Sequence, residues 1–169
     1  MSEMLVNKVA ESGIVTIDPA DFYPKGEIVS FDMKEHLFMG LILKEKDFRA
    51  ALLSLDWEKF RDKNVAVFCS ADAIIPVWAY MLVASYLQPI AKQIVFGNET
   101  SLINDLMKEN LSALNAQDFT DKRVVIKGCG ELPIPESAYV NITSMLRPYV
   151  KSIMYGEPCS TVPIYKKKA

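Results

Sequence analysis

Two stretches of the chain, residues 65–97 and 124–156, repeat one another, and this repeat constrains the fold more than any other feature. With a shift of 59 residues, the stretches agree at eight of the nineteen positions from 79 to 97. The residues that recur are Ala79, Tyr80, Ser85, Leu87, Pro89, Lys92, Ile94 and Gly97. Self-similarity at a fixed spacing indicates a duplicated structural unit, and two copies are too few for a solenoid. The repeat therefore predicts a domain built from two related halves.

Each copy opens with an apolar run that ends in a cysteine. The runs cover residues 65–69 and 124–129, and their cysteines are 60 residues apart rather than 59. We therefore expect one residue to be gained or lost in the loop that follows. Short apolar runs bounded by turn residues are typical of buried strands. Each half is thus expected to begin with a strand whose last residue is a cysteine.

Strand and helix signals alternate through both copies. Helices are predicted over residues 74–87, 102–111 and 136–146, and strands over residues 65–69, 93–96, 123–127 and 152–155. Alternation of this kind indicates βαβ units, whose crossovers are nearly always right-handed. We expect an α/β fold, a three-layer domain with a mainly parallel sheet and a core of four strands.

The 169 residues are expected to form a single domain with three parts. These are an N-terminal β/α extension (1–62), the first repeat half (63–98) and the second (122–160). Within the extension, residues 14–17 and 27–31 predict strands, and residues 44–55 predict an amphipathic helix. The apolar run at 37–43 fits either a strand or a buried helix, because periodicity does not separate the two.

Composition narrows the class of protein. The net charge of −2 gives no reason to expect a nucleic-acid partner. The first residues do not read as a signal peptide, so we expect a cytoplasmic protein with reduced thiols. Residues 73–91 carry no charge, but Pro76, Ser85, Gln88 and Pro89 interrupt them. We expect a largely buried crossover helix in a dimer interface, and no membrane span.

The three cysteines suggest a metal site. Cys69 and Cys129 end predicted strands, and Cys159 follows another by a few residues. Ligand sites in open α/β sheets form beyond the carboxyl ends of the strands, so we expect the thiols on one edge. Thiolates bind zinc, iron or an iron–sulfur cluster, and His36 or Asp72 would complete the set of ligands. The leading hypothesis is a metal-binding protein.

Three alternatives remain. In the first alternative, the three cysteines are buried packing residues, as free cysteine commonly is. Cys69 or Cys129 is a reactive thiol near a helix N-terminus, in a thiol enzyme or sulfur carrier. Finally, the chain is a metal-free α/β interaction module that forms a homodimer through the uncharged helix at 74–87. No catalytic residue is predicted, and the sequence leaves open whether the protein is an enzyme.

Several segments resemble an uncharacterised bacterial protein family, a domain of unknown function. The segments are residues 40–49, 69–80, 127–129 with Pro135 and 138–139, and 156–163. The resemblance spans most of the chain after residue 27, and the family has no established site residues to transfer. It implies genes that neighbour those for iron–sulfur cluster assembly. The expected role is accessory to iron–sulfur or metal metabolism, with iron–sulfur assembly proteins as partners.

Overall fold

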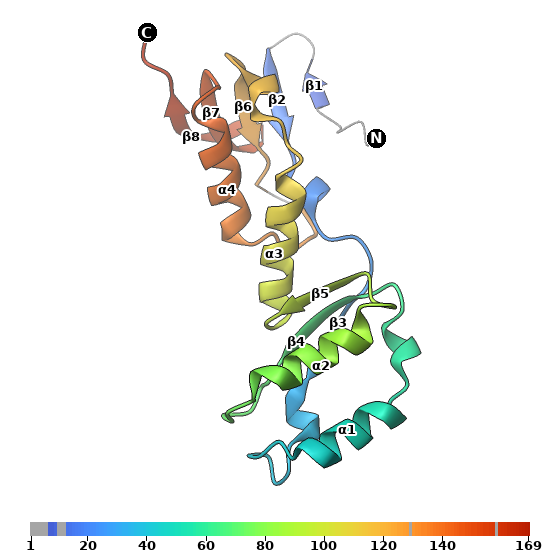
Figure 1. Cartoon of the computed structure of the whole chain (residues 1–169). Coiled ribbons are helices and arrows are strands. Elements are labelled where there is room, and N and C mark those ends of the chain that lie inside the picture. Colours follow the sequence, from blue (N-terminus) through green and yellow to red (C-terminus); the bar gives the residue numbers. More distant parts are fainter. Residues whose placement is uncertain (1–6, 10–12, 129, 158) are drawn as a thin grey trace. The chain divides into compact units, whose positions relative to one another are not determined.

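The computed structural model describes residues 7–9, 13–128, 130–157 and 159–169 of the chain (Figure 1). The chain forms two compact units. Unit 1 consists of Met1–Pro24 with Leu106–Ala169, and unit 2 is Lys25–Asp105. Unit 2 is therefore inserted into unit 1 in the sequence. Each unit contains its own β-sheet.

Unit 2 is built on a three-stranded parallel sheet with the order β3-β4-β5. Its elements are β3 (Ile28–Asp32), the 3-10 helix η2 (Met33–His36), α1 (Glu45–Ser54), the 3-10 helix η3 (Trp57–Phe60), β4 (Asn64–Phe68), α2 (Val77–Leu87) and β5 (Gln93–Phe96). α3 (Glu99–Leu111) follows, and the boundary between the units falls within it.

The core of unit 2 packs helices against one face of β4. Val65 and Val67 share that face because side chains alternate along a strand. They cluster with buried residues of α1 and with Ala79, Val83 and Leu87 of α2. These three residues recur every fourth position, which gives α2 a single buried stripe. Full burial of an aliphatic side chain contributes about 1.5–3 kcal/mol, so this stripe fixes the helix on the sheet.

Unit 1 contains a five-stranded sheet with the order β1-β2-β6-β7-β8. Its elements are β1 (Asn7–Val9), β2 (Ile14–Ile17), the 3-10 helix η1 (Pro19–Phe22), the 3-10 helix η4 (Ala116–Phe119), β6 (Arg123–Ile126), α4 (Glu136–Leu146), β7 (Ser152–Glu157) and β8 (Ser160–Lys166). The three central strands are parallel, and β1 and β8 add antiparallel edges.

The two units repeat one frame, which Figure 1 shows as β4-α2-β5 and β6-α4-β7. α2 and α4 begin and end 59 residues apart, and so do η3 and η4. β6 pairs with β7 in the register in which β4 pairs with β5. The turn before each middle strand also recurs, with φ of 58° at Asp62 and 59° at Asp121. The repeat is therefore a structural duplication.

The first parallel strand of each unit is equivalent as well. β2 starts opposite the first residue of β6, and β3 starts opposite the first residue of β4. Asp18, which directly follows β2, and Asp32, the last residue of β3, consequently hold equivalent positions. Each carboxylate accepts a hydrogen bond from a backbone N–H of the following 3-10 helix, that of Ala20 or that of Lys34, at 2.9 Å.

The α/β class with mainly parallel sheets is confirmed, and so are the repeated helices and the strands expected at 14–17 and 27–31. The expected single core of four strands is wrong, because these strands lie in two sheets. The reason is the two N-terminal strands. β3 pairs with one edge of β4 and β2 with one edge of β6, so each middle strand has both edges occupied within its own unit. That residues 1–169 form one domain stays a prediction.

Two local expectations are also corrected. The spacing of 59 holds through the strands, so the equivalent of Cys69 is Gly128 and not Cys129. The apolar run at 37–43 is an exposed turn, with Phe38 bridged to Ile42 and a positive φ at Met39. Within the described ranges, no helix is long and apolar enough to cross a membrane.

Candidate functional site

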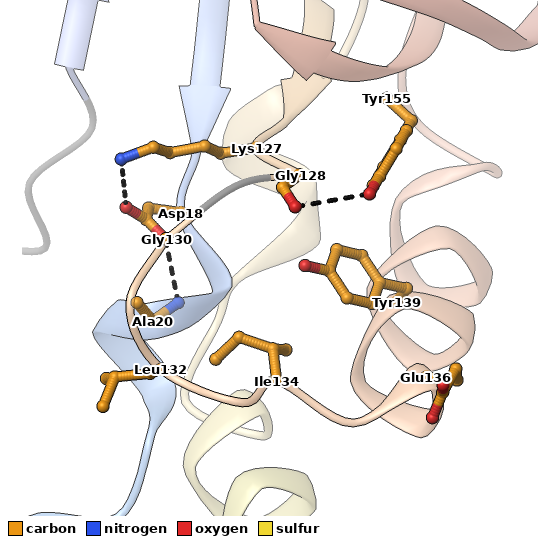
Figure 2. Close-up of a pocket in the computed structure, with 10 residues that line it drawn as sticks. All are labelled: Asp18, Ala20, Lys127, Gly128, Gly130, Leu132, Ile134, Glu136, Tyr139 and Tyr155. Carbon is orange, nitrogen blue, oxygen red and sulfur yellow. Dashed lines mark hydrogen bonds and ion pairs between the residues drawn. The ribbon is translucent and has the colours of Figure 1, made fainter.

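Each unit presents the carboxyl edge of its parallel strands, which is where α/β folds place their sites. In unit 1 this edge is formed by the residues that follow β2 and β6, together with the end of β7 and the start of α4. A pocket of about 550 Å³ lies there (Figure 2). It is lined by Asp18, Ala20, Lys127, Gly128, Gly130, Leu132, Ile134, Glu136, Tyr139 and Tyr155. A volume of this size accommodates a small organic molecule.

One side of the pocket is an ion pair. Lys127 Nζ lies 3.1 Å from Asp18 Oδ2, and both side chains are about one third exposed. The other carboxylate oxygen of Asp18 accepts the Ala20 N–H at 2.9 Å. Because β2 and β6 are neighbours, the pair joins the ends of two adjacent strands. It gives the pocket a polar wall without adding net charge.

The facing side is aromatic. Tyr139 comes from α4 and Tyr155 from β7, and their rings meet edge to face with centroids 5.7 Å apart. The Tyr155 hydroxyl donates to the carbonyl oxygen of Gly128 at 3.3 Å, as Figure 2 shows. A Cβ on Gly128 would lie 2.5 Å from Cζ of Tyr155, so only glycine lets this ring sit where it does.

Glu136 stands at the start of α4 and completes the polar lining. It lies three residues before Tyr139, so the two side chains share one side of the helix. Among the described residues, Glu136 has no hydrogen bond or ion pair. Leu132 and Ile134, from the loop before α4, supply the apolar part.

The matching edge of unit 2 is chemically different. Asp32 accepts hydrogen bonds from the backbone N–H and the hydroxyl of Ser70. Partial burial acts to raise the pKa of Asp32, but the bonds from Ser70 and Lys34 hold it below its usual value. Burial, and then the neighbouring Cys69 and Asp32, raise the pKa of the Tyr80 phenol. This edge is a compact hydrogen-bonded cluster.

The repeat allows the two edges to be compared position by position. The aspartate and the tyrosine of the helix are shared, as Asp32 and Tyr80 in unit 2 and as Asp18 and Tyr139 in unit 1. Ile134 is shared as well, with Ile75. The other seven lining positions differ, and going from unit 2 to unit 1 they read Lys34 to Ala20, Phe68 to Lys127, Cys69 to Gly128, Ala71 to Gly130, Ala73 to Leu132, Val77 to Glu136 and Phe96 to Tyr155. Unit 1 therefore has two charges and a hydroxyl at its strand ends and helix start that unit 2 lacks, and it lacks the charge of Lys34 and the side chain of Cys69.

The cysteines expected to hold a metal are only partly described. Cys69 is half-buried just past β4, with its Sγ 3.6 Å from the carbonyl oxygen of Ala71. Cys159 is exposed in the turn between β7 and β8. Cys129 lies outside the described residues. Cys69 belongs to unit 2 and the other two to unit 1. In the described part of the chain, no three His, Cys, Asp or Glu side chains are grouped to hold a metal ion. The metal site stays a prediction.

The two candidate ligands outside the cysteines lie in unit 2. His36 stacks on Phe31 with ring centroids 5.3 Å apart, and its edge meets Phe48 at 5.6 Å. Asp72 is exposed in the loop between β4 and α2. His36 therefore has a packing role in the aromatic core, and a ligand role for either residue stays a prediction.

Sequence reasoning missed the pocket residues. None of Asp18, Lys127 and Tyr139 is predicted as a site residue by the sequence patterns. A signal was nevertheless present in the repeat. When the two copies are aligned at an offset of 59, Lys127 aligns with Phe68 and Glu136 aligns with Val77. A charged residue in place of an apolar one, at the end of a strand or the start of a helix, indicates a site.

Comparison with known proteins assigns the chain to a protein family. A model of a protein family of unknown function (DUF2480) matches residues 3–167. The chain belongs to this family, as its sequence segments indicated. No curated protein and no solved structure matches it.

The packing of His36 gives a prediction on pH. Burial lowers the pKa of His36, with Glu35 acting to raise it and Lys59 to lower it. The unfolded chain therefore binds a proton more readily, and its histidine titrates near 6.5. The contribution of neutral His36 to the free energy of unfolding should be fully present above roughly pH 6.5. It should be lost as the pH drops from there to the lower pKa of His36 in the folded protein. Urea unfolding across this window measures the loss.

His36→Phe keeps the stacked ring and removes the titration. This variant should lose less stability than the wild type between neutral pH and the folded pKa. Equal losses in the two proteins would contradict the burial argument, because carboxylates would then account for the whole pH dependence. The protein has a single histidine, so its folded pKa can be read directly by NMR.

Proposed function

We propose that this protein binds a small organic molecule in the pocket of unit 1. The observation that carries the proposal is the divergence between the duplicated edges. One frame occurs twice in the chain, and only its packing stripe has to be kept for the fold. The carboxyl edges nevertheless differ between the units, and unit 1 has the charged or hydroxylated Lys127, Glu136 and Tyr155 where unit 2 has Phe68, Val77 and Phe96.

The lining supports the proposal because it has the composition of a ligand site. Ligand pockets combine apolar and aromatic surface with a few fixed polar groups. Here the ion pair of Asp18 and Lys127 is fixed by strand pairing, and Tyr155 is fixed by its contact with Gly128. The site is thus largely formed before a ligand binds.

Titration with 2-phenylethanol tests the proposal by NMR. Backbone amide signals of pocket residues, such as Gly130 and Tyr139, should shift on binding. The equivalent residues of unit 2, Ala71 and Tyr80, should not shift, and they serve as a control within the same molecule. Shifts spread evenly over both units, or no shifts at the pocket with either this alcohol or 2-phenylethylamine and 3-phenylpropionate, would contradict the proposal.

A matched pair of glycine variants sharpens the test. Gly128→Ala places a methyl group against the Tyr155 ring, so the ring must move and binding should weaken by about fivefold. Gly130→Ala lines the same pocket, but its Cβ meets nothing within 4 Å. It should change affinity by less than about twofold. Equal effects would show that Tyr155 does not contact the ligand.

A second proposal is that the chain forms a homodimer through the outer face of α2. Val77 and Met81 on this face are 74% and 67% exposed, and Ile74 just before the helix is 94% exposed. The inward stripes of α2 and α4 match, but their outer faces do not. At the exposed start of the helix, α4 has Glu136 where α2 has Val77. At positions that are partly buried in α2, α4 has Ser137, Asn141 and Thr143 where α2 has Trp78, Leu82 and Ala84. The duplicated fold therefore tolerates polar residues at these positions.

A second copy of the chain is the partner that fits this face. Across a two-fold axis, a surface meets its own residues, so any charge near the axis faces a like charge. Residues 73–91 carry no charge, which removes that penalty. Contiguous exposed apolar surface of this kind marks interaction sites in soluble proteins.

A matched pair of variants also tests the dimer. Met81 and Val140 are equivalent positions of α2 and α4, and both side chains are 67% exposed. Met81→Glu should turn the dimer into a monomer, because two carboxylates would be buried face to face. Val140→Glu should leave the dimer intact. Sedimentation over a concentration series reports both, and a monomeric wild type or equal effects of the variants would contradict the proposal.

Metal binding by Cys69, Cys129 and Cys159 is kept as an alternative function. It is supported by chain order, since Cys129 and Cys159 follow the neighbouring strands β6 and β7 in unit 1. An accessory role in iron–sulfur metabolism, with assembly proteins as partners, depends on the same hypothesis.

Metal analysis of anaerobically purified protein tests this alternative. Zinc or iron should be present in an amount comparable to the chain and should fall in each Cys→Ser variant, because every thiolate would be a ligand. Trace metal that the three variants leave unchanged would contradict it. The pocket proposal does not depend on this result.

A further inference from the structure

We infer that the ligand of the unit 1 pocket is a small organic amine, with one positive charge on an apolar or aromatic body. This inference deepens the proposed function and rests on it. The charges, the rings and the apolar residues of the lining each indicate one property of the ligand.

The charges come first. Asp18, Lys127 and Glu136 are the side chains of the lining that carry a charge at neutral pH. Lys127 and Asp18 neutralise each other at 3.1 Å. Glu136 has no ion pair within the described part of the chain, so the described lining residues together carry a negative charge. An anionic ligand would meet this charge unfavourably, and a cationic one would pair with it.

The rings favour the same sign. The face of an aromatic ring carries partial negative charge and attracts an ammonium group. Tyr139 is three residues after Glu136 on α4 and lines the same pocket, so in this inference the ring and the carboxylate contact one cation. Tyr155 meets that ring edge to face and extends the aromatic wall. Carboxylate and rings thus act on a single ammonium group.

The remaining lining indicates the body of the ligand. Leu132 and Ile134 line the pocket from the loop before α4. The volume of about 550 Å³ exceeds what an ammonium ion needs and leaves room for a hydrocarbon or aromatic group. An inorganic cation would leave this apolar surface uncovered.

Glu136 is not required by the fold, which strengthens its assignment to the ligand. The equivalent first residue of α2 is Val77, and α2 forms without an acidic residue in its first turn. A carboxylate at a helix start interacts favourably with the helix dipole, but the paired helix shows that this interaction is dispensable here.

A set of three probes with one shared body tests the inference by calorimetry. 2-Phenylethylamine, 2-phenylethanol and 3-phenylpropionate differ in the charge of the end group. The amine should bind about five- to tenfold more tightly than the alcohol, and the carboxylate should bind most weakly. Glu136→Gln should reduce the preference for the amine to about twofold or less.

Glu131→Gln is the matched control, because Glu131 lies in the loop that leads into α4, five residues before Glu136, and does not line the pocket. It should keep the full preference for the amine. The unfolding midpoint of both variants, measured alongside, shows whether α4 remains intact. A preference for the amine that is equally lost in both variants would overturn the assignment of Glu136.

The outcomes separate this inference from the proposal beneath it. If all three probes bind at the pocket with equal affinity, the amine inference is wrong and the pocket remains a binding site. If the carboxylate binds most tightly, the ligand is an anion and the inference is again wrong. If no probe shifts the signals of Gly130 or Tyr139, the proposed function itself fails.

Discussion

The packing of one helix on one parallel strand pair supports everything else in this structure. In unit 2 it is made by Ala79, Val83 and Leu87, and in unit 1 by Ala138, Ile142 and Leu146, all at most 1% exposed. The spacing of four residues presents a single stripe to the sheet. Small residues come first and larger ones follow in both copies. This stripe is the fully buried part of each helix, and the copies differ mainly at exposed or partly buried helix positions and at the strand ends.

Outside this stripe, the two copies differ in their chemistry. In unit 1 the strand ends gained Lys127 and Tyr155, and a pocket formed against the shared aspartate and tyrosine. In unit 2 the strand end has Phe68 and Cys69, and Val77 and Met81 of α2 are apolar and exposed. One copy is thus suited to a ligand and the other to a protein surface. Because of the duplication, the equivalent residues of the other unit serve as a control for each of these two proposals.

Much of the fold could be predicted from the sequence, because periodicity and the repeat report local structure directly. The helices, the parallel pairing and the strands at 14–17 and 27–31 followed from these patterns. Strand order did not, since hydrogen bonds between strands leave no trace in the spacing of apolar residues. The single predicted core therefore became two sheets, with β2 and β3 each joined to a different copy.

The site was harder to predict than the fold. Cysteines attracted attention because thiols have distinctive chemistry, whereas Asp18 and Glu136 are common residues that become a site only when the chain brings them together. Alignment on the cysteines also introduced a gap of one residue that the structure does not have. The strand pairing shows that Gly128 is the counterpart of Cys69, and this glycine is what gives Tyr155 its place. The informative signal was the set of differences between the copies rather than their shared residues.

The central claim is that one frame carries a pocket in unit 1 because of a few residues at the strand ends. It is tested most directly by building the same pocket in unit 2 with Phe68→Lys, Cys69→Gly, Val77→Glu and Phe96→Tyr. Calorimetric titration with 2-phenylethylamine measures the number of sites. The account predicts a rise from about one to about two ligands per chain. A folded variant that still binds a single ligand, or a wild type that already binds two, would contradict it.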